Sequence, residues 1–223
     1  MKDNLLIDGL VKIGISEEQA QQLSPKLESY INEIILFNSA YNLTNTSDHD
    51  ELVIRHILDS LAAYLPMKNL IEKVKSSGNP APLIGDIGSG GGLPGIPLGA
   101  VFFEEKFNLV ERMSKRCAFL ENCAAILGLK NVEVVNSEAE KVPEEKYDII
   151  TFRAFRPLDE QMTKTLLRMT KKGGYLAAYK AKMDSIKEEM AGIKQIVSDY
   201  EVIPLTVPGL EDSERNLVVI KKE

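Results

Sequence analysis

Tryptophan is absent from this chain of 223 residues, and cysteine and histidine occur only twice each. The two cysteines, Cys117 and Cys123, fall in one expected helix at a spacing that points them to different faces, so pairing is not expected. Both are read as small apolar residues in a reduced cytoplasm. A chain of this length can bury enough surface to fold without a disulfide or a metal, and no metal site is expected.

Long apolar runs are also missing. No run reaches the roughly 18 residues that a membrane span needs. The start of the chain, Met1 to Asn4, lacks the basic and apolar regions of a signal peptide. We therefore expect a cytoplasmic protein with no membrane partner.

Positive charge is in deficit, because 27 lysines and arginines stand against 33 aspartates and glutamates, for a formal net charge of −6. Phosphate contacts need cations, so this balance argues mildly against a protein that coats bare nucleic acid. It does not exclude a local basic surface.

The apolar pattern divides the chain near residue 80. Residues 1–80 carry apolar side chains at helical spacing and are expected to form an N-terminal helical extension. In residues 81–223, β-rich runs alternate with helical stretches, which indicates right-handed crossovers and a mainly parallel α/β sheet covered on both faces. The expected strands are 83–87, 107–111, 132–136, 148–152, 174–179, 201–206 and 216–221, and the expected helices are 94–102, 114–127, 157–170 and 184–198.

Local signals predict where some elements begin and end. In the extension, Ser24-Pro25 has the pattern of a helix start, and a later helix from Leu52 is expected to stop at Pro66. The last two strands are joined by only about ten residues, which is too short for a crossover helix. We therefore expect a doubly wound sheet of seven strands that ends in an antiparallel hairpin.

A glycine-rich turn is the strongest local signal. After the strand that ends near Asp86, four of the next residues, Gly88 and Gly90 to Gly92, are glycines, which let the backbone approach a ligand closely. The helix that follows offers free amide groups to an anion. A dinucleotide fingerprint would need its third glycine where Leu93 stands, so NAD is disfavoured. S-adenosylmethionine fits better, with its carboxylate at the helix and its amino end facing Asp86.

The ends of the next strands add to this site. Glu111 ends the second strand, where an acid accepts hydrogen bonds from both ribose hydroxyls of a nucleoside. The polar turn 136–140 after the third strand is expected beside the adenine. The loop after the fourth strand holds Arg153, Phe155 and Arg156, which suit a base and its phosphates.

Several cations are expected near the same edge of the sheet, so a basic patch can coexist with the net negative charge. We predict that they bind RNA. The residues are Lys115, Arg116, Arg156 and Lys180.

The chain resembles the GidB-like family ("glucose-inhibited division protein B") of bacterial 16S ribosomal RNA guanine-N7 methyltransferases over nearly its whole length. The shared stretches include Tyr41-Asn42-Leu43-Thr44, Arg55-His56-Ile57-Leu58-Asp59-Ser60, the turn from Asp86 to Pro97, Lys115-Arg116 and Arg153-Ala154-Phe155. The resemblance implies a Rossmann-like, class I S-adenosylmethionine-dependent methyltransferase fold. It also implies a methyl transfer to N7 of guanine 527, with 16S rRNA or the small ribosomal subunit as partner. Separately from the resemblance, we expect a monomer.

The resemblance further implies roles for single residues. Gly88 and Leu93 would line the cofactor, Ala139 and Glu140 would border the adenine, and Arg153 would contact the cofactor or the target base. Because guanine N7 carries a free lone pair, the reaction needs no general base. Catalysis would rest on placing N7 in line with the methyl group and its leaving sulfur, with Arg153 as the candidate catalytic residue.

The sequence departs from the family at Glu111-Arg112, where Asp-Ser is usual, and at Ala181, where glycine is common. Other readings are a small-molecule methyltransferase with a lidded apolar pocket, an NAD-dependent oxidoreductase, and a non-catalytic RNA-binding protein.

Overall fold

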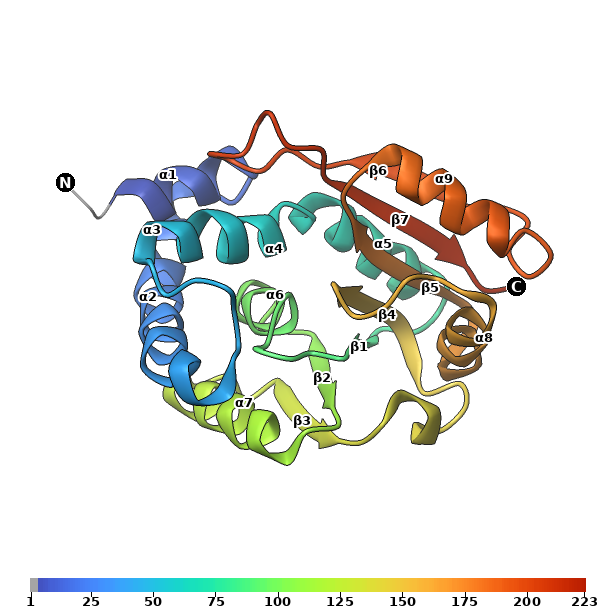
Figure 1. Cartoon of the computed structure of the whole chain (residues 1–223), viewed down its shortest axis with the longest axis horizontal. Coiled ribbons are helices and arrows are strands. Elements are labelled where there is room, and N and C mark those ends of the chain that lie inside the picture. The colour runs from blue at the N-terminus through green and yellow to red at the C-terminus, as the bar shows by residue number, and fades with distance from the viewer. Residues whose placement is uncertain (1–3) are drawn as a thin grey trace.

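The computed structural model describes residues 4–223. The expectation of no signal peptide rests largely on Met1 to Asp3, which lie outside the described residues. The core of the molecule is one seven-stranded sheet in the order β3-β2-β1-β4-β5-β7-β6 (Figure 1). Its strands are β1 (Leu83–Ile87), β2 (Lys106–Glu111), β3 (Val132–Asn136), β4 (Tyr147–Arg153), β5 (Thr170–Lys180), β6 (Glu201–Pro204) and β7 (Asn216–Lys221).

Strand direction confirms the predicted fold. The pairs β1–β2, β2–β3, β1–β4 and β4–β5 are parallel, whereas β7 is antiparallel to both of its neighbours, β5 and β6. The terminal hairpin therefore exists as predicted, with β7 inserted between β5 and β6. Alternate side chains of each strand point to opposite faces, so Ile149 and Ile150 of β4 enter different cores.

Helices cover both faces of the sheet (Figure 1). On one face α6 and α7 pack together with the N-terminal helices, and on the other face lie α8 and α9. The bounds are α1 (Asn4–Lys12), α2 (Glu17–Tyr41), α3 (His49–Leu52), the π-helical η1 (Val53–Leu58), α4 (Asp59–Leu61), α5 (Tyr64–Ser76), α6 (Gly95–Val101), α7 (Ser114–Ile126), the 3₁₀ turn η2 (Ala139–Lys141), α8 (Glu160–Met169) and α9 (Met183–Gly192).

Two proline-based predictions in the N-terminal region are wrong. Helix α2 continues through Pro25, because Leu23, Leu27 and other side chains on both sides of the proline pack into the core. That burial offsets the roughly 3 kcal/mol that an interior proline costs. Pro66 does not end a helix but lies in the first turn of α5, where a proline is tolerated.

The N-terminal helices share one continuous core with the sheet, in which Leu27 and Ile57 belong to the same cluster as Leu109 and Ile149. The division into an extension, residues 1–80, and a methyltransferase domain, residues 81–223, stays a prediction. Within residues 4–223, no helix is both long and apolar enough to cross a membrane.

The chain runs outward from β1 to β3 and then returns to place β4 on the other side of β1. The winding therefore reverses between β1 and β4. In open α/β sheets, ligands bind beyond the carboxyl ends of the strands at such a point. Ile87, Glu111, Arg153 and Lys180 all end strands at this edge.

Candidate functional site

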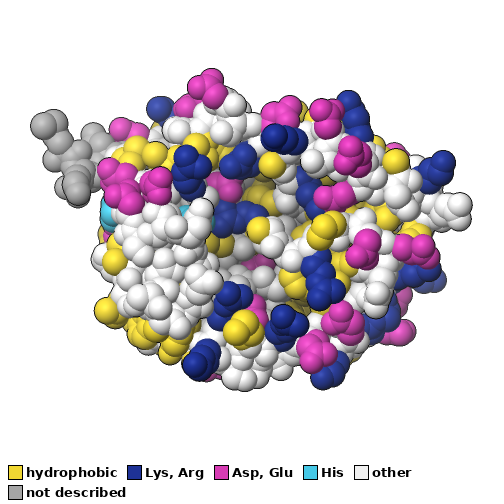
Figure 2. All heavy atoms as spheres, viewed as in Figure 1, with side chains coloured by type: hydrophobic (Ala, Val, Ile, Leu, Met, Phe, Trp, Pro, Cys, Tyr) yellow, Lys and Arg dark blue, Asp and Glu magenta, His cyan; other side chains and the backbone are white. Residues whose placement is uncertain are grey.

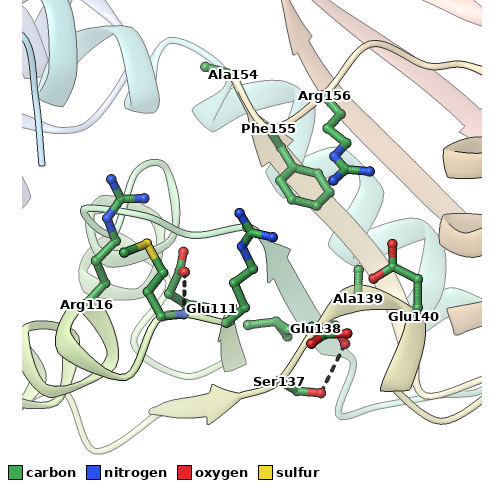
Figure 3. Close-up of a pocket in the computed structure, with 13 residues that line it drawn as sticks. Glu111, Arg116, Ser137, Glu138, Ala139, Glu140, Ala154, Phe155 and Arg156 are labelled. Atoms are coloured by element: carbon green, nitrogen blue, oxygen red, sulfur yellow. Dashed lines mark hydrogen bonds between the residues drawn. The ribbon is translucent and has the colours of Figure 1, made fainter. Parts of the chain in front are cut away.

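Two cavities open side by side at the carboxyl edge of the sheet. We name the first, of about 360 Å³, the glycine-turn cavity. We name the second, of about 450 Å³, the arginine cavity. They share one wall, the segment from Ala154 to Arg156. Figure 3 shows the glycine-turn cavity, which is lined by Gly88, Val110, Glu111, Arg112, Met113, Arg116, Ser137, Glu138, Ala139, Glu140, Ala154, Phe155 and Arg156.

Asp86, near the end of β1, stabilises the glycine turn through hydrogen bonds. Its Oδ2 accepts hydrogen bonds from Ser89 Oγ at 2.6 Å and from the Gly95 amide at 3.0 Å. Gly88 has a φ of 70°, in the region that glycine adopts without cost. The side chain of Asp86 is buried, and burial raises its pKa to about 6 although the bonds from Ser89 and Gly95 act in the opposite direction.

The second oxygen of Asp86, Oδ1, is buried and has no hydrogen-bond partner among the described residues. An unsatisfied buried carboxylate oxygen is costly, and a donor from a ligand would relieve that cost. This atom fits the predicted role of Asp86 towards an amino group, either directly or through water.

Glu111 closes one side of the glycine-turn cavity. Its Oε2 accepts from the Gly90 amide at 3.0 Å and its Oε1 accepts from the Met113 amide at 2.8 Å. These bonds fix the carboxylate, and each oxygen retains a lone pair for another donor. The family usually has aspartate at this position, and Glu111 still places a carboxylate in the cavity wall, as the sequence predicts.

The turn after β3 forms the floor in Figure 3, with Ser137, Glu138 and the buried Ala139. Ala139 and Glu140 lie in η2, directly after the strand that pairs with β2. Apolar atoms of Ala139 and Met113 contribute to the same cavity as Glu111. A flat apolar ring can thus lie between Ala139 and Met113, while Glu111 beside it accepts hydrogen bonds from the hydroxyls of a sugar.

Arg153 lies in the wall of the arginine cavity, where charged groups surround it. Its Nη1 donates to Asp59 Oδ2 at 2.6 Å, and Arg215 Nε donates to the other oxygen of Asp59 at 2.9 Å. Arg153 Nη2 lies 3.2 Å from Nδ1 of His56. Burial, and then the charge of Arg153, lower the pKa of His56 to about 4, so this ring is neutral and its Nδ1 accepts.

The predicted residues separate into three groups by position. The glycine-turn cavity is lined by Gly88, Glu111, Ala139, Glu140, Arg116 and Arg156, and the arginine cavity by Arg153, Arg156 and Lys180. Outside the walls of both cavities lie Asp86, Gly90, Leu93 and Lys115. Leu93 is buried in the core and Lys115 is exposed at the start of α7.

Sequence reasoning missed three residues of the arginine cavity region. Asp59 and Arg215 line the cavity, and His56 contacts Arg153. The motif from Arg55 to Ser60 is part of the family resemblance, but nothing in its spacing shows that its acid faces β4. Arg215 precedes a strand in a segment without a motif.

Basic side chains surround the hollow in the centre of the face in Figure 2, in which lysine and arginine are dark blue. The cavity-lining cations are Arg112, Arg116, Arg153, Arg156, Lys180 and Arg215. Lys180 also pairs with Glu189 at 2.5 Å and is largely buried, so part of its charge is already compensated. Among the side chains that the structure describes, no three of the usual metal ligands gather into a possible metal site.

Comparisons with known proteins agree with this geometry. A profile of the family described as rRNA small subunit methyltransferase G (GidB) matches residues 23–218. A protein of that name from Treponema denticola is 41% identical over 243 residues, covering 100% of this chain and 95% of its own length. Its counterpart from Neisseria meningitidis serogroup B is 35% identical, covering 96% of this chain and 95% of its own length.

Solved structures show the same fold. A tRNA (m1A58) methyltransferase, TrmI, from Aquifex aeolicus superposes with a TM-score of 0.54 at 15% identity, covering 73% of this chain and 68% of its own. A predicted O-methyltransferase from Agrobacterium tumefaciens gives 0.52 at 22% identity, covering 69% of this chain and 79% of its own. The predicted methyltransferase fold is thereby confirmed.

Proposed function

We infer the reaction from the family: this chain belongs to the GidB family, rRNA small subunit methyltransferase G, and methylates 16S rRNA with S-adenosylmethionine. Family membership sets aside the oxidoreductase, the small-molecule methyltransferase and the non-catalytic RNA-binding protein. We propose that the acceptor atom is N7 of guanine 527. The observation that carries this proposal is the pair of cavities that meet at Ala154 to Arg156.

The residues of the glycine-turn cavity fit S-adenosylmethionine. When bound, this cofactor supplies a methyl group on a positively charged sulfur. We propose that Glu111 accepts from its ribose hydroxyls and that Met113 and Ala139 contact its adenine. Asp86 lies outside the cavity wall, so its Oδ1, the buried oxygen without a partner, would reach the amino end of the cofactor through water. The volume of about 360 Å³ lies within the range of small-molecule sites.

The arginine cavity is the proposed place of the guanine. Arg153 lies in its wall and not in that of the glycine-turn cavity, which favours a contact of Arg153 with the base over a contact with the cofactor. Asp59 orients the guanidinium of Arg153, whose remaining N–H groups can donate to O6 of guanine and leave the N7 lone pair free for attack. No residue needs to take a proton, since N7 has none, so these side chains act by holding the base in line for attack.

Substrate form, location and assembly are also proposals. We propose that the protein acts in the cytoplasm as a monomer, on 16S rRNA alone or within the small ribosomal subunit. The basic rim of the two cavities supports an RNA surface of this kind. At Ala181, where the chain departs from the family's glycine, the backbone does not need glycine's freedom, because φ is not positive; its carbonyl accepts from Asn216 Nδ2 at 2.6 Å.

The test is transfer of a labelled methyl group from S-adenosylmethionine to small subunits from cells that lack this protein, with free 16S rRNA alongside. We expect label on N7 of guanine 527, and the ratio between the two substrates shows which is recognised. Label on another atom or nucleotide would refute the proposed target.

The variant Glu111→Ala tests the cofactor site separately. It should weaken cofactor binding by roughly 10–150-fold in calorimetry, because a charge-assisted hydrogen-bond pair is lost.

A further inference from the structure

Phe155 lies in the common wall of the two cavities, directly after Arg153 and Ala154 at the end of β4. Its ring rests against the glycine turn: a methyl group added at Gly88 would lie only 2.0 Å from Cδ2 of Phe155. Figure 3 shows this ring above the glycine-turn cavity, between the labelled Ala154 and Arg156. The ring thus covers the backbone of the glycine turn at Gly88.

The backbone beside Phe155 is strained. Ala154 has a φ of 51°, in the left-handed region that residues with a Cβ rarely adopt. Such strain costs of order 1 kcal/mol and persists where the surroundings impose it, most often at functional sites. Here the strained residue aims the ring of Phe155 at Gly88. Phe152 supports the ring from the sheet side in an edge-to-face contact, with centroids 6.5 Å apart.

A ring in this place conflicts with the proposed use of the glycine-turn cavity. Under the proposed function the cofactor lies in the cavity that Gly88 lines, and it therefore approaches the backbone that the ring covers. Phe155 can yield towards the arginine cavity, since the same side chain lines both spaces. An aromatic ring there is suited to stack on a nucleobase.

We propose that Phe155 is a positioning residue that couples the two cavities: its ring leaves Gly88 when S-adenosylmethionine binds and then stacks against the target guanine. This inference rests on the proposed function of the two cavities. The ring then lies between the cofactor in the glycine-turn cavity and the guanine in the arginine cavity, and leaves open only the path from N7 to the methyl group. Arg153 and Arg156, on either side of Phe155, hold the base edge and a phosphate.

The absence of tryptophan from the chain gives a direct test. Phe155→Trp carries a single tryptophan, and its emission should shift in wavelength or intensity when S-adenosylmethionine is added to the otherwise intact protein. Phe103→Trp is the matched control. Phe103 is 63% exposed and lies in the segment that leads into β2, at the amino edge of the sheet and far from both cavities.

We expect a saturable change in Phe155→Trp with the affinity that calorimetry gives, and no change in Phe103→Trp. Calorimetric binding of S-adenosylmethionine without any spectral change in Phe155→Trp would overturn the coupling and leave the proposed function standing. Absence of calorimetric binding in the unmodified protein would overturn both. The two failures are therefore distinguishable.

Kinetics give a second, independent readout. Phe155→Ala should lower kcat on small subunits by roughly 5–150-fold, the value of one stacked base, while cofactor affinity is unchanged or higher because no ring has to move. Phe155→Tyr keeps the ring and should restore turnover, whereas Phe155→Leu should not. If Tyr and Leu behave alike, or if all three variants lose cofactor affinity together with thermal stability, the side chain is only a packing element and the proposal fails.

Discussion

Asp86 carries a carboxylate that is 1% exposed beneath the glycine turn, with one oxygen bonded to the turn and the other without a partner. Its pKa is about 6 in the folded chain, so the folded state retains a proton that the unfolded state loses near pH 4. The folded state thus binds more protons between these two values, and the free energy of unfolding falls as pH rises through that window.

We predict that Asp86→Asn removes this part of the pH dependence. In urea titrations, the wild-type free energy of unfolding should lose up to about 3 kcal/mol from this group between pH ~4 and pH ~6, and then level off. The variant should lack that component and be more stable than wild type at neutral pH. It should also bind S-adenosylmethionine more weakly. An equal pH profile for both proteins would contradict the assignment.

Asp59 is the residue through which Arg153 and Arg215 are held together. Each of its oxygens accepts from one guanidinium, at 2.6 and 2.9 Å, and its side chain is 10% exposed. Without that charge the two cations would repel each other, and Arg153 would lose its orientation towards the arginine cavity.

We predict that Asp59→Asn lowers kcat on small subunits by roughly 10–100-fold through misplacement of the base. Stability should fall by about 1.5–3 kcal/mol, the value of hydrogen bonds to charged groups. Cofactor affinity in calorimetry should not change, because Asp59 does not line the glycine-turn cavity. Asp184→Asn is the control, since that carboxylate is 95% exposed and makes only a long contact with Lys187. Loss of cofactor binding in Asp59→Asn would contradict this role.

At the scale of elements, the sequence predicted the sheet well because its signals are local. The strands 83–87, 132–136 and 216–221 agree with the structure in both bounds, since runs with aliphatic residues end there at polar or glycine turns. Glu111 and the turn at 139–140 follow from the same logic, because carboxyl ends of parallel strands meet at one edge.

Long-range contacts explain what was not predictable. The helix α2 that contains Pro25 and the π-helical η1 both pack into the shared core against residues distant in sequence, which no local pattern encodes. Arg215 becomes a site residue only because β7 lies beside β5 and brings its first residues near Asp59. The ion pair between residues 59 and 215 joins segments far apart in sequence, and neither segment has a signal for the other.

Helix α2 has a direct effect on the glycine turn. The hydroxyl of Tyr30, which is fully buried, donates to the carbonyl of Gly91 at 2.5 Å. Leu43, just beyond the same helix, packs on Gly91, and the carbonyl of Asn42 accepts from Arg116 at 3.1 Å. The N-terminal helices therefore shape the cofactor turn as well as covering apolar surface.

We predict that Tyr30→Phe destabilises the protein by about 1–3 kcal/mol, because it leaves the buried carbonyl of Gly91 without a donor. The turn should loosen, so S-adenosylmethionine should bind more weakly while the circular dichroism spectrum is unchanged. Tyr200→Phe, at a residue that is 39% exposed, is the control for removal of a hydroxyl. Wild-type stability and affinity in Tyr30→Phe would show that α2 does not control the turn.

At the scale of the whole molecule, the local charge around the two cavities differs from the net charge of the chain. The chain has a formal net charge of −6, yet cations surround the two cavities at the carboxyl edge. Because exposed charges are screened beyond about 10 Å at ordinary salt, an RNA at this edge responds to the local cations and only weakly to the net charge.

If RNA responds to the local cations, its binding depends on the edge from which a cation is removed. Lys115 and Arg156 lie at the carboxyl edge, and Lys106 and Lys172 lie in the amino-terminal parts of β2 and β5, at the opposite edge. Two double variants with both cations of one edge changed to glutamine therefore have the same net charge. We predict that the pair at the carboxyl edge weakens binding to small subunits and lowers the salt slope, log Kd against log salt, by about 1.4–1.8.

The pair at the amino edge should leave both the affinity and the slope at their wild-type values. The measurement is filter binding at several potassium chloride concentrations, with cofactor affinity checked by calorimetry, since Arg156 also lines the glycine-turn cavity. Equal losses in the two double variants would mean that the RNA senses net charge alone. A loss of affinity confined to the Lys115 and Arg156 double variant would instead place the RNA at the edge where the two cavities meet. Only at that edge can the RNA contact these cations through its phosphates while its target base enters the arginine cavity.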